Sequence, residues 1–223
     1  MDNDALVRAA ALNNAEWCDA VSRTHGVKGA FGATAWTASR RTPPFYPDAV
    51  TLTAGADTPE ILGRVDIASG GCSVKDSFGC LDLAADGFEV LFDAQWIHRA
   101  AGAPAPATDL QWQRVETAGE LAAWEAAWDG GVTGLFLPDL LGDETVAVFA
   151  GYDGSTLVAG AVANRSASVV GFSNTFGAWP GALAPIAELW PSLPLVGYES
   201  GDDLDDALAQ GFEAIGPLRI WLA

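Results

Sequence analysis

The second half of the chain carries the clearest alternation of hydrophobic and polar positions. LQWQRVET at 110–117 alternates as a strand does, and the next segment, 118–130, carries Leu121, Trp124 and Trp128 at i, i+3 and i+7. That spacing places the three side chains on one face of a helix. The pattern therefore predicts a strand followed by an amphipathic helix.

Three apolar runs follow between 145 and 176, and two turn signals separate them. The turn signals are Tyr-Asp-Gly-Ser at 152–155 and Asn-Arg-Ser-Ala at 164–167, while the runs are rich in Val, Ala and Phe. Such runs between short polar turns predict three antiparallel strands. The next segment, 177–194, is bounded by Pro and Gly and predicts a short helix in which Pro185 fits the first turn.

The chain ends in a predicted strand, helix and strand. LPLVGYES at 193–200 has the apolar run of a buried strand, and EAIGPLRIWLA at 213–223 predicts the final strand. Between them, 201–212 predicts a helix whose acidic residues complement the positive N-terminal end of the helix dipole.

The end of the chain also repeats a short pattern from its middle. ALAQGFEAIGPLRIWLA closes the chain, and LAADGFEVLFDAQWIHRA occurs at 83–100. Allowing one inserted residue, the aligned positions are Gly87, Phe88, Glu89 and Trp96 with Gly211, Phe212, Glu213 and Trp221. Internal similarity of this kind predicts two related halves.

A break in the pattern separates the two copies. AAGAPAPATD at 100–109 has no periodicity, two prolines and many small residues, which is typical of a linker. We therefore expect a shortened, divergent half at 1–99, a linker at 100–109 and a fuller half at 110–223.

Composition bounds the class of protein. Half of the 223 residues are hydrophobic, which is enough for a large core, and no apolar run approaches the roughly 20 residues of a membrane span. The start, MDNDALVRAA, lacks the basic and apolar regions of a signal peptide, so we expect a soluble, cytoplasmic protein. The three cysteines have no metal-type spacing, and the sequence suggests no metal site.

The protein is strongly acidic, with a net charge of −18. Residues 1–105 carry 8 basic and 13 acidic side chains, whereas 106–223 carry 3 basic and 16 acidic ones. Such a surface repels phosphate backbones and anionic membranes. Neither nucleic acid nor a membrane is therefore an expected partner.

The second half resembles the GNAT superfamily, the acetyl-CoA-dependent N-acyltransferases. The resemblance rests on the element order over 110–223, on VAVFAGYDGSTLVAGAVA, and on DALAQGFEAIGPLRIWL, which is similar to the family's closing pattern of Ala, two or three residues, Gly-Phe and a strand. The segment 73–97 resembles the same closing strand, helix and strand. The resemblance implies an α/β (α+β) fold, with a mixed central sheet flanked by helices in two related halves. It also implies transfer of an acetyl group from acetyl-CoA to a small amine.

The resemblance implies a cofactor site after the third strand of the meander. Family members hold the pyrophosphate with a loop of the form Gln/Arg-x-x-Gly-x-Gly/Ala, and NTFGAWPGALAP at 174–185 stands there in this sequence. The spacing of its glycines differs, no Arg or Gln stands first, and Pro180 lacks an N–H donor. The residues that the resemblance assigns to the cofactor are Ser173, Asn174, Phe176, Gly177 and Gly181.

The resemblance also implies catalytic residues at the end of the next strand. Glu199 is the candidate general base, because a partly buried carboxylate beside the split in the sheet has a raised pKa, and Tyr198 is its neighbour. The alternative is that one of the two points into the core while the other caps the acidic helix. The family's frequent tyrosine in the last helix would fall at 207–209, where this sequence has Ala, Leu and Ala.

Several polar or aromatic residues are candidates for binding substrate. Arg40 and Arg41 precede three prolines and form either an anion clamp or ion pairs across the interface between the halves. Lys75 and Asp76 correspond in the repeat to the position of Glu199 and line an equivalent cleft or form a surface ion pair. Trp179 lies in the cofactor loop, where it either covers the site or anchors the loop to the core.

Two alternatives to an acyltransferase fit the same residues. The first is a non-catalytic GNAT-like module that binds a small-molecule ligand between its halves. The second is an interaction protein, such as a homodimer, suggested by the many Trp and Ala residues. Fold analogy by itself does not decide among them.

Overall fold

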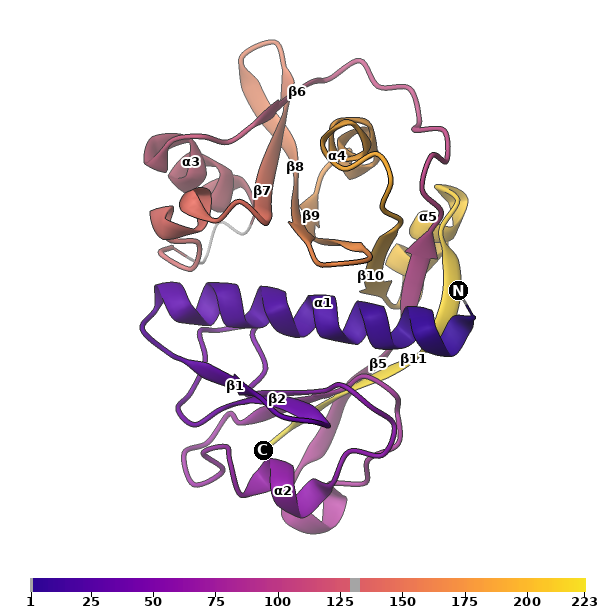
Figure 1. Cartoon of the computed structure of the whole chain (residues 1–223). Helices are drawn as coiled ribbons and strands as arrows, with labels where there is room; N and C mark the ends of the chain where they lie inside the picture. Colours follow the sequence, from indigo (N-terminus) through magenta and orange to yellow (C-terminus); the bar gives the residue numbers. More distant parts are fainter. Residues whose placement is uncertain (1, 129–132) are drawn as a thin grey trace.

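The computed structural model describes residues 2–128 and 133–223 and contains one mixed sheet (Figure 1). The strand order is β1-β2-β3-β4-β11-β5-β10-β9-β8-β7-β6. The strands are β1 (Gly29–Phe31), β2 (Ala35–Ala38), β3 (Ala49–Thr51), β4 (Ser73–Asp76), β5 (Glu89–Arg99), β6 (Gln111–Arg114), β7 (Val146–Asp153), β8 (Thr156–Arg165), β9 (Val170–Phe176), β10 (Leu195–Glu199) and β11 (Glu213–Leu222).

Helices cover both faces of this sheet. The α-helices are α1 (Asn3–Thr24), α2 (Thr58–Leu62), α3 (Ala118–Trp128), α4 (Leu183–Leu189) and α5 (Gly201–Ala209), and the 3-10 helices are η1 (Ala84–Asp86), η2 (Pro138–Gly142) and η3 (Trp179–Ala182). The core under α4 and α5 is separate from the core under α1. The expected mixed sheet flanked by helices is confirmed.

The element order predicted for the second half is also confirmed. Strand, helix, three strands, helix, strand, helix and strand occur in that order from β6 to β11. The predicted end of the first of these helices, at 129 and 130, lies outside the described residues. In the first half, the helix expected within 73–97 is only the three-residue 3-10 turn η1, and α1 was not predicted at all.

The final strands of the two halves cross into each other's part of the sheet. β5 lies between β10 and β11, and β11 lies between β4 and β5. The register of this central antiparallel pair runs from Glu213↔His98 to Leu222↔Glu89. The boundary at 100–109 stays a prediction, but backbone hydrogen bonds join the segments on either side of it into one sheet.

The repeated pattern occupies equivalent positions in this central pair. Gly87 and Gly211 both have left-handed backbones, with φ of 90° and 82°, and the phenylalanine after each is buried. The ladder is irregular between Ala214 and Gly216, and again where Trp221 faces Val90. A duplication of whole halves stays a prediction.

The alignment of Trp96 with Trp221 by one inserted residue is wrong. Trp96 packs with Ile220 in the core under α1, whereas Trp221 packs in the core under α2. Successive residues of a strand point to opposite faces, so Ile220 is the counterpart of Trp96.

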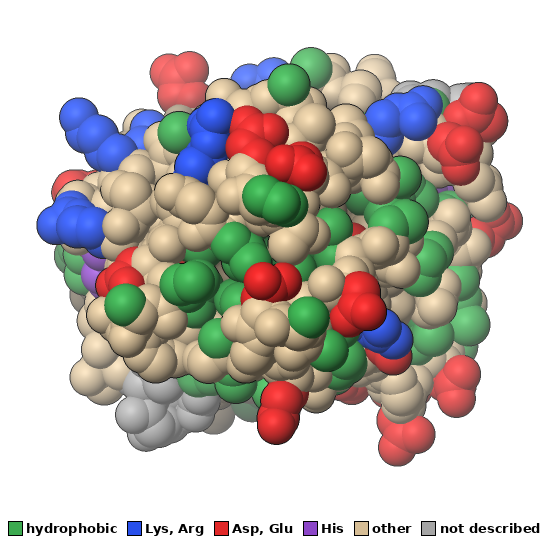
Figure 2. Space-filling view, turned by 90° about the horizontal axis from the view of Figure 1, so that it is seen from below, with side chains coloured by type: hydrophobic (Ala, Val, Ile, Leu, Met, Phe, Trp, Pro, Cys, Tyr) green, Lys and Arg blue, Asp and Glu red, His purple; other side chains and the backbone are tan. Residues whose placement is uncertain are grey.

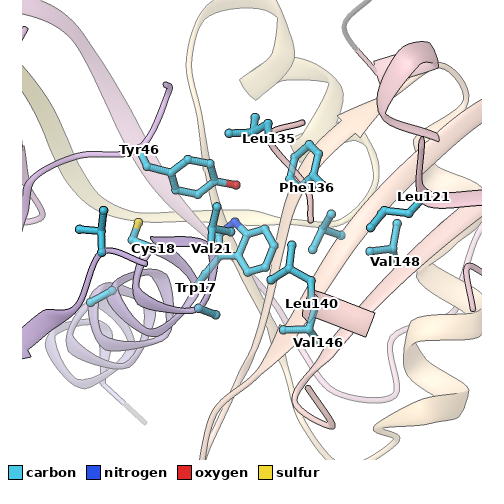
Figure 3. Close-up of a cluster of buried hydrophobic side chains, with 14 of the residues drawn as sticks. Trp17, Cys18, Val21, Tyr46, Leu121, Leu135, Phe136, Leu140, Val146 and Val148 are labelled. Carbon is cyan, nitrogen blue, oxygen red and sulfur yellow. The ribbon is translucent and has the colours of Figure 1, made fainter. Parts of the chain in front are cut away.

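The helix α1 runs between the two halves and packs against both (Figure 1). The Asp2 side chain caps it by accepting a hydrogen bond from the N–H of Ala5 at 2.8 Å. Its Trp17, Cys18 and Val21 share one core with side chains from α3, η2 and β7 of the second half (Figure 3). This shared core holds the first-half helix over the second-half strands.

Two buried asparagines fix α1 against β8. The Asn13 Nδ2 donates to the Asn164 carbonyl at 2.9 Å, and the Asn164 Nδ2 donates to the Asn13 carbonyl at 3.0 Å. Both residues are buried, so each bond satisfies a group that water does not reach. The pair sets the position of α1 along the sheet.

The surface is mixed. The view from below in Figure 2 shows hydrophobic side chains spread among Asp and Glu side chains. Among the helices of the described residues, none has the length and hydropathy of a membrane span.

Replacing Asn164 with Ala tests the fixing of α1. The change leaves the buried Asn13 carbonyl without its side-chain donor, so we expect the free energy of unfolding to fall by about 1–3 kcal/mol in urea titrations. The control is Arg64→Ala, which removes an exposed ion pair to Glu60 and is expected to cost less than about 1 kcal/mol. Equal losses in both variants would contradict this role.

Candidate active site

The two parallel strands β9 and β10 separate partway along their length. They pair only at Leu195↔Val170 and Val196↔Gly171. Beyond that point β10 pairs with β5, and β9 pairs with β8. The sheet is therefore split between the outer parts of β9 and β10.

A bulge in β9 lies at this split. Val162 faces Ser173, whereas Gly160 faces Phe176, so β9 has one extra residue between these pairs. Asn174 lies in the bulge with φ of 51°, in the left-handed region. Its Oδ1 accepts hydrogen bonds from Trp17 Nε1 at 3.2 Å and from the Ser173 hydroxyl at 3.1 Å. The bulge is thus held in place by α1.

A cavity of about 640 Å³ follows the split. Its walls come from both halves of the chain: α1, β4 and the loop at 45–47 from the first half, and β9, β10 and α5 from the second. Of the predicted cofactor residues, those that line it are Ser173, Asn174, Phe176 and Gly177. Of the other predicted site residues, those that line it are Lys75, Trp179, Tyr198 and Glu199.

Glu199 ends β10 at the cavity wall, and its side chain is only partly exposed. Burial is the main cause that raises the pKa of its carboxyl to about 7, and the negative charge of Asp203 adds to the shift. Ser200, not Glu199 or Tyr198, is the N-cap of α5. The carboxyl can therefore accept a proton near neutral pH.

Tyr198 faces the core under α1, as the alternative interpretation of this pair expected for one of its members. Its ring meets the ring of Trp96 edge-on at 5.7 Å between centroids. The Lys75 ammonium lies 4.3 Å from the centroid of the Tyr198 ring and donates to Asn14 Oδ1 at 2.8 Å. Lys75 is only 4% exposed.

Tyr46 is a cavity residue that sequence reasoning missed. Its hydroxyl is buried and has no hydrogen-bond partner among the described residues, although Asn174 and Trp17 lie beside it. Figure 3 shows its ring next to Trp17 and Cys18. Burial raises the pKa of this hydroxyl well above its usual value, so the phenol keeps its proton. No local pattern in FYPD indicates that this side chain enters a site formed by the second half.

The glycines of the predicted cofactor loop are explained by packing. At Gly177, which has φ of 60°, a Cβ would lie 2.0 Å from the Val158 carbonyl oxygen. At Gly181 it would lie 2.3 Å from Trp112 Nε1, and Gly181 does not line the cavity. Trp179 packs against Phe172 at 5.2 Å between ring centroids and also lines the cavity, so it both anchors the loop and forms the wall.

The structure does not bring Arg40 and Arg41 to the cavity. The Arg40 guanidinium donates to the Gly26 carbonyl. The Arg41 guanidinium binds the buried carboxylate of Asp48 and two backbone carbonyls. Because Asp48 belongs to the first half, the described residues provide Arg41 with neither a clamp facing the second half nor an ion pair across the interface.

Asp76 does not reach the cavity either. Its carboxylate accepts hydrogen bonds from the N–H groups of Leu81 at 2.7 Å and Phe78 at 3.3 Å, which fix the turn after β4. Both Lys75 and Asp76 are buried. The alternative of a surface ion pair between them is therefore wrong, because adjacent strand residues point to opposite faces.

Comparison with solved structures finds the same fold elsewhere. A GCN5-related N-acetyltransferase from Kribbella flavida is 15% identical, with a TM-score of 0.68, over 100% of this chain and 96% of that one. A protein from Novosphingobium aromaticivorans assigned to the GNAT family is 12% identical, with a TM-score of 0.55, over 95% of this chain and 97% of that one.

A third match is a GCN5-related N-acetyltransferase-like protein from Streptococcus suis. It is 11% identical, with a TM-score of 0.53, over 97% of both chains. No family model and no curated protein matches the sequence. The structural likeness shows that the chain has the GNAT fold.

The raised pKa of Glu199 predicts a pH-dependent effect on stability. Burial raises the pKa of the carboxyl from its ordinary value of 4.5 to about 7 in the folded protein, so its contribution to stability falls as the pH rises from about 4.5 through 7. Glu199→Gln cannot ionise. The Tm of the variant minus that of the wild type should therefore be about 2–5 °C larger at pH 8 than at pH 4.5.

Differential scanning calorimetry at both pH values measures this difference. The matched control is Glu188→Gln, which changes an exposed glutamate of α4 away from the cavity. A pH-independent difference for Glu199→Gln, or an equal effect in the control, would rule out the raised pKa.

Proposed function

We propose that the protein is an N-acyltransferase that moves an acetyl group from acetyl-CoA to a small amine. The observation that carries the proposal is the position of the Glu199 carboxyl in the wall of a cavity beside the split of a GNAT-fold sheet, where burial raises its pKa to about 7. A buried base of this pKa is suited to removing a proton from an ammonium group at neutral pH.

The residues of the split suit part of the acetyl donor. The neutral pantetheine arm fits along β9, where the bulge at Asn174 leaves one residue outside the β8 ladder and free to bind a ligand. The cavity suits the charged pyrophosphate less well, because the carboxylates of Glu199, Asp203 and Asp206 line it and repel a negative group. In the loop, the N–H groups of Trp179 and Gly181 already donate to carbonyls of the same loop.

Glu199 acts on the acceptor in this proposal. Bound acetyl-CoA would supply an electrophilic thioester carbon. The Glu199 carboxylate accepts the proton of the acceptor's ammonium and leaves a neutral amine with a free electron pair. The position of Glu199 in the cavity wall, beside the point where β9 and β10 separate, supports this role.

Tyr46 is the second group of the proposal. The last helix, where the family's tyrosine would fall, offers a buried Ala207 but no phenol. Tyr46 instead lines the cavity from the first half, its buried hydroxyl lies beside Asn174 of the β9 bulge, and burial keeps its phenol protonated. In this proposal the Tyr46 phenol donates a proton to the departing sulfur.

A non-catalytic ligand-binding protein is the second candidate. The observation that favours it is the charge of the cavity wall, where Asp203 and Asp206 oppose the phosphates of a CoA molecule. Such a protein would gain stability from a small ligand but would turn nothing over.

Thermal unfolding with acetyl-CoA and with plain CoA distinguishes the candidates. A ligand at 100 times its dissociation constant stabilises a protein by about 2.7 kcal/mol, so a clear rise in Tm is expected with both compounds. Acetyl transfer to a panel of small amines should then be detectable by mass spectrometry. Stabilisation without any transfer would favour the non-catalytic candidate, and no stabilisation would argue against a CoA donor.

The base is tested in the same transfer assay. Glu199→Gln should lower kcat by roughly 10²–10⁴-fold and remove the rise of the wild-type rate through pH 7. Glu188→Gln is the matched control and should keep both the rate and the pH profile. A normal profile in Glu199→Gln would assign the base to another residue.

The proton donor has its own test. Tyr46→Phe removes only the hydroxyl, so we expect kcat to fall by about 10-fold or more while the rise in Tm caused by acetyl-CoA is kept. Tyr152→Phe, on β7 and outside the cavity lining, is the control. An unchanged kcat in Tyr46→Phe would exclude this role.

A further inference from the structure

A buried ammonium group lies in the wall of the cavity. Lys75 is 4% exposed, and among the described residues its ammonium has one hydrogen bond, to Asn14 Oδ1, and one contact with the ring of Tyr198. Within the described residues it forms no ion pair. An ammonium has three donors, and a buried charge normally has an opposite charge beside it. Lys75 is therefore only partly compensated by the protein.

The charges of the cavity are arranged in two groups. Lys75 is the one cationic side chain among the described residues of its lining, and it enters from β4 under α1. The carboxylates of Glu199, Asp203 and Asp206 enter from the end of β10 and from α5. A ligand complementary to this wall carries a positive group at one end and a negative group at the other.

We propose that the acceptor is an amino acid, an amine that also carries a carboxylate, and that Lys75 binds this carboxylate. The role of the amine rests on the proposed acyl transfer, whereas the binding of the carboxylate does not. When the acceptor's ammonium lies at Glu199, the acceptor's carboxylate supplies the negative charge that the Lys75 ammonium lacks. An amine without a carboxylate leaves Lys75 uncompensated and places a second cation in the same cavity.

The donor's phosphates are the other anions to consider at Lys75. The Lys75 ammonium contacts the ring of Tyr198 on β10, and Lys75 and Glu199 line the same cavity, so an anion bound at Lys75 shares that cavity with the reacting amine. In acetyl-CoA the phosphates are separated from the thioester by the whole pantetheine arm. The acetyl group and a phosphate of one donor therefore do not both lie beside this end of β10.

Calorimetric binding to the wild-type protein without any acyl donor tests the carboxylate. The probes are the common α-amino acids, β-alanine and γ-aminobutyrate, and each one that binds is compared with its decarboxylated amine and its amide. We expect the Kd of the amino acid to be at least about 10-fold lower than that of either analogue. Equal binding of the analogues, or no binding anywhere in the panel, would overturn the inference.

Lys75→Met tests the residue. The other lysine of the chain, Lys28, is exposed, so Lys28→Met is the matched control. We expect Lys75→Met to weaken amino-acid binding by at least about 10-fold and to bind the decarboxylated amine at least as tightly as the wild type does. A merely structural role would weaken both ligands together. If Lys75→Met does not fold, the comparison of ligands on the wild-type protein decides alone.

The remaining outcomes separate this inference from the proposed function. Loss of CoA binding in Lys75→Met, with amino-acid binding unchanged, would assign the anion to the donor and overturn the inference. Amino-acid binding through Lys75 without acetyl transfer would refute the acyltransferase and leave the ligand class standing. Equal transfer to amino acids and to their decarboxylated amines would confirm the enzyme and refute the ligand class.

Discussion

The antiparallel ladder between β5 and β11 holds both halves of the chain in one sheet. Each of these two strands also pairs with a strand of the other half: β11 pairs with β4, and β5 pairs with β10. The parts of the candidate site depend on this crossing, because it sets β4 and its Lys75 at a fixed distance from the split at β9 and β10. A protein of two independent domains joined by a linker would not hold these groups in register.

The helix α1 contacts polar groups of both halves at the cavity. Its Asn13 bonds to Asn164 on β8, its Asn14 accepts from Lys75 on β4, and its Trp17 donates to Asn174 in the β9 bulge. Residues 13, 14 and 17 lie on one side of a helix, since they are spaced by one, three and four positions. One rigid element thus positions polar groups from both halves around the same cavity.

Local patterns in the sequence were enough to predict the second-half elements, and the resemblance to the GNAT superfamily added the place of Glu199 beside the split. The turns at 152–155 and 164–167 and the acidic start of α5 are signals within a few residues of the structures that they specify. Tyr46 and the burial of Lys75 could not be predicted, since they depend on contacts such as the one between Lys75 and Tyr198, which are far apart in the sequence. The helix α1 also carries a local pattern, because Leu6, Val7, Ala10 and Ala11 are buried along one face.

The two most unusual groups of the cavity are unusual for the same physical reason. Burial raises the pKa of Glu199, which means that its charged form is unfavourable, and burial leaves the charge of Lys75 partly uncompensated. A zwitterionic ligand relieves both, because its ammonium favours the ionised carboxylate and its carboxylate favours the ammonium of Lys75. Groups whose burial destabilises the unliganded protein in this way are common at binding sites, where function is favoured over stability. The free energy released when both charges gain partners is available to bind the ligand, and it is available only to a ligand that carries both charges.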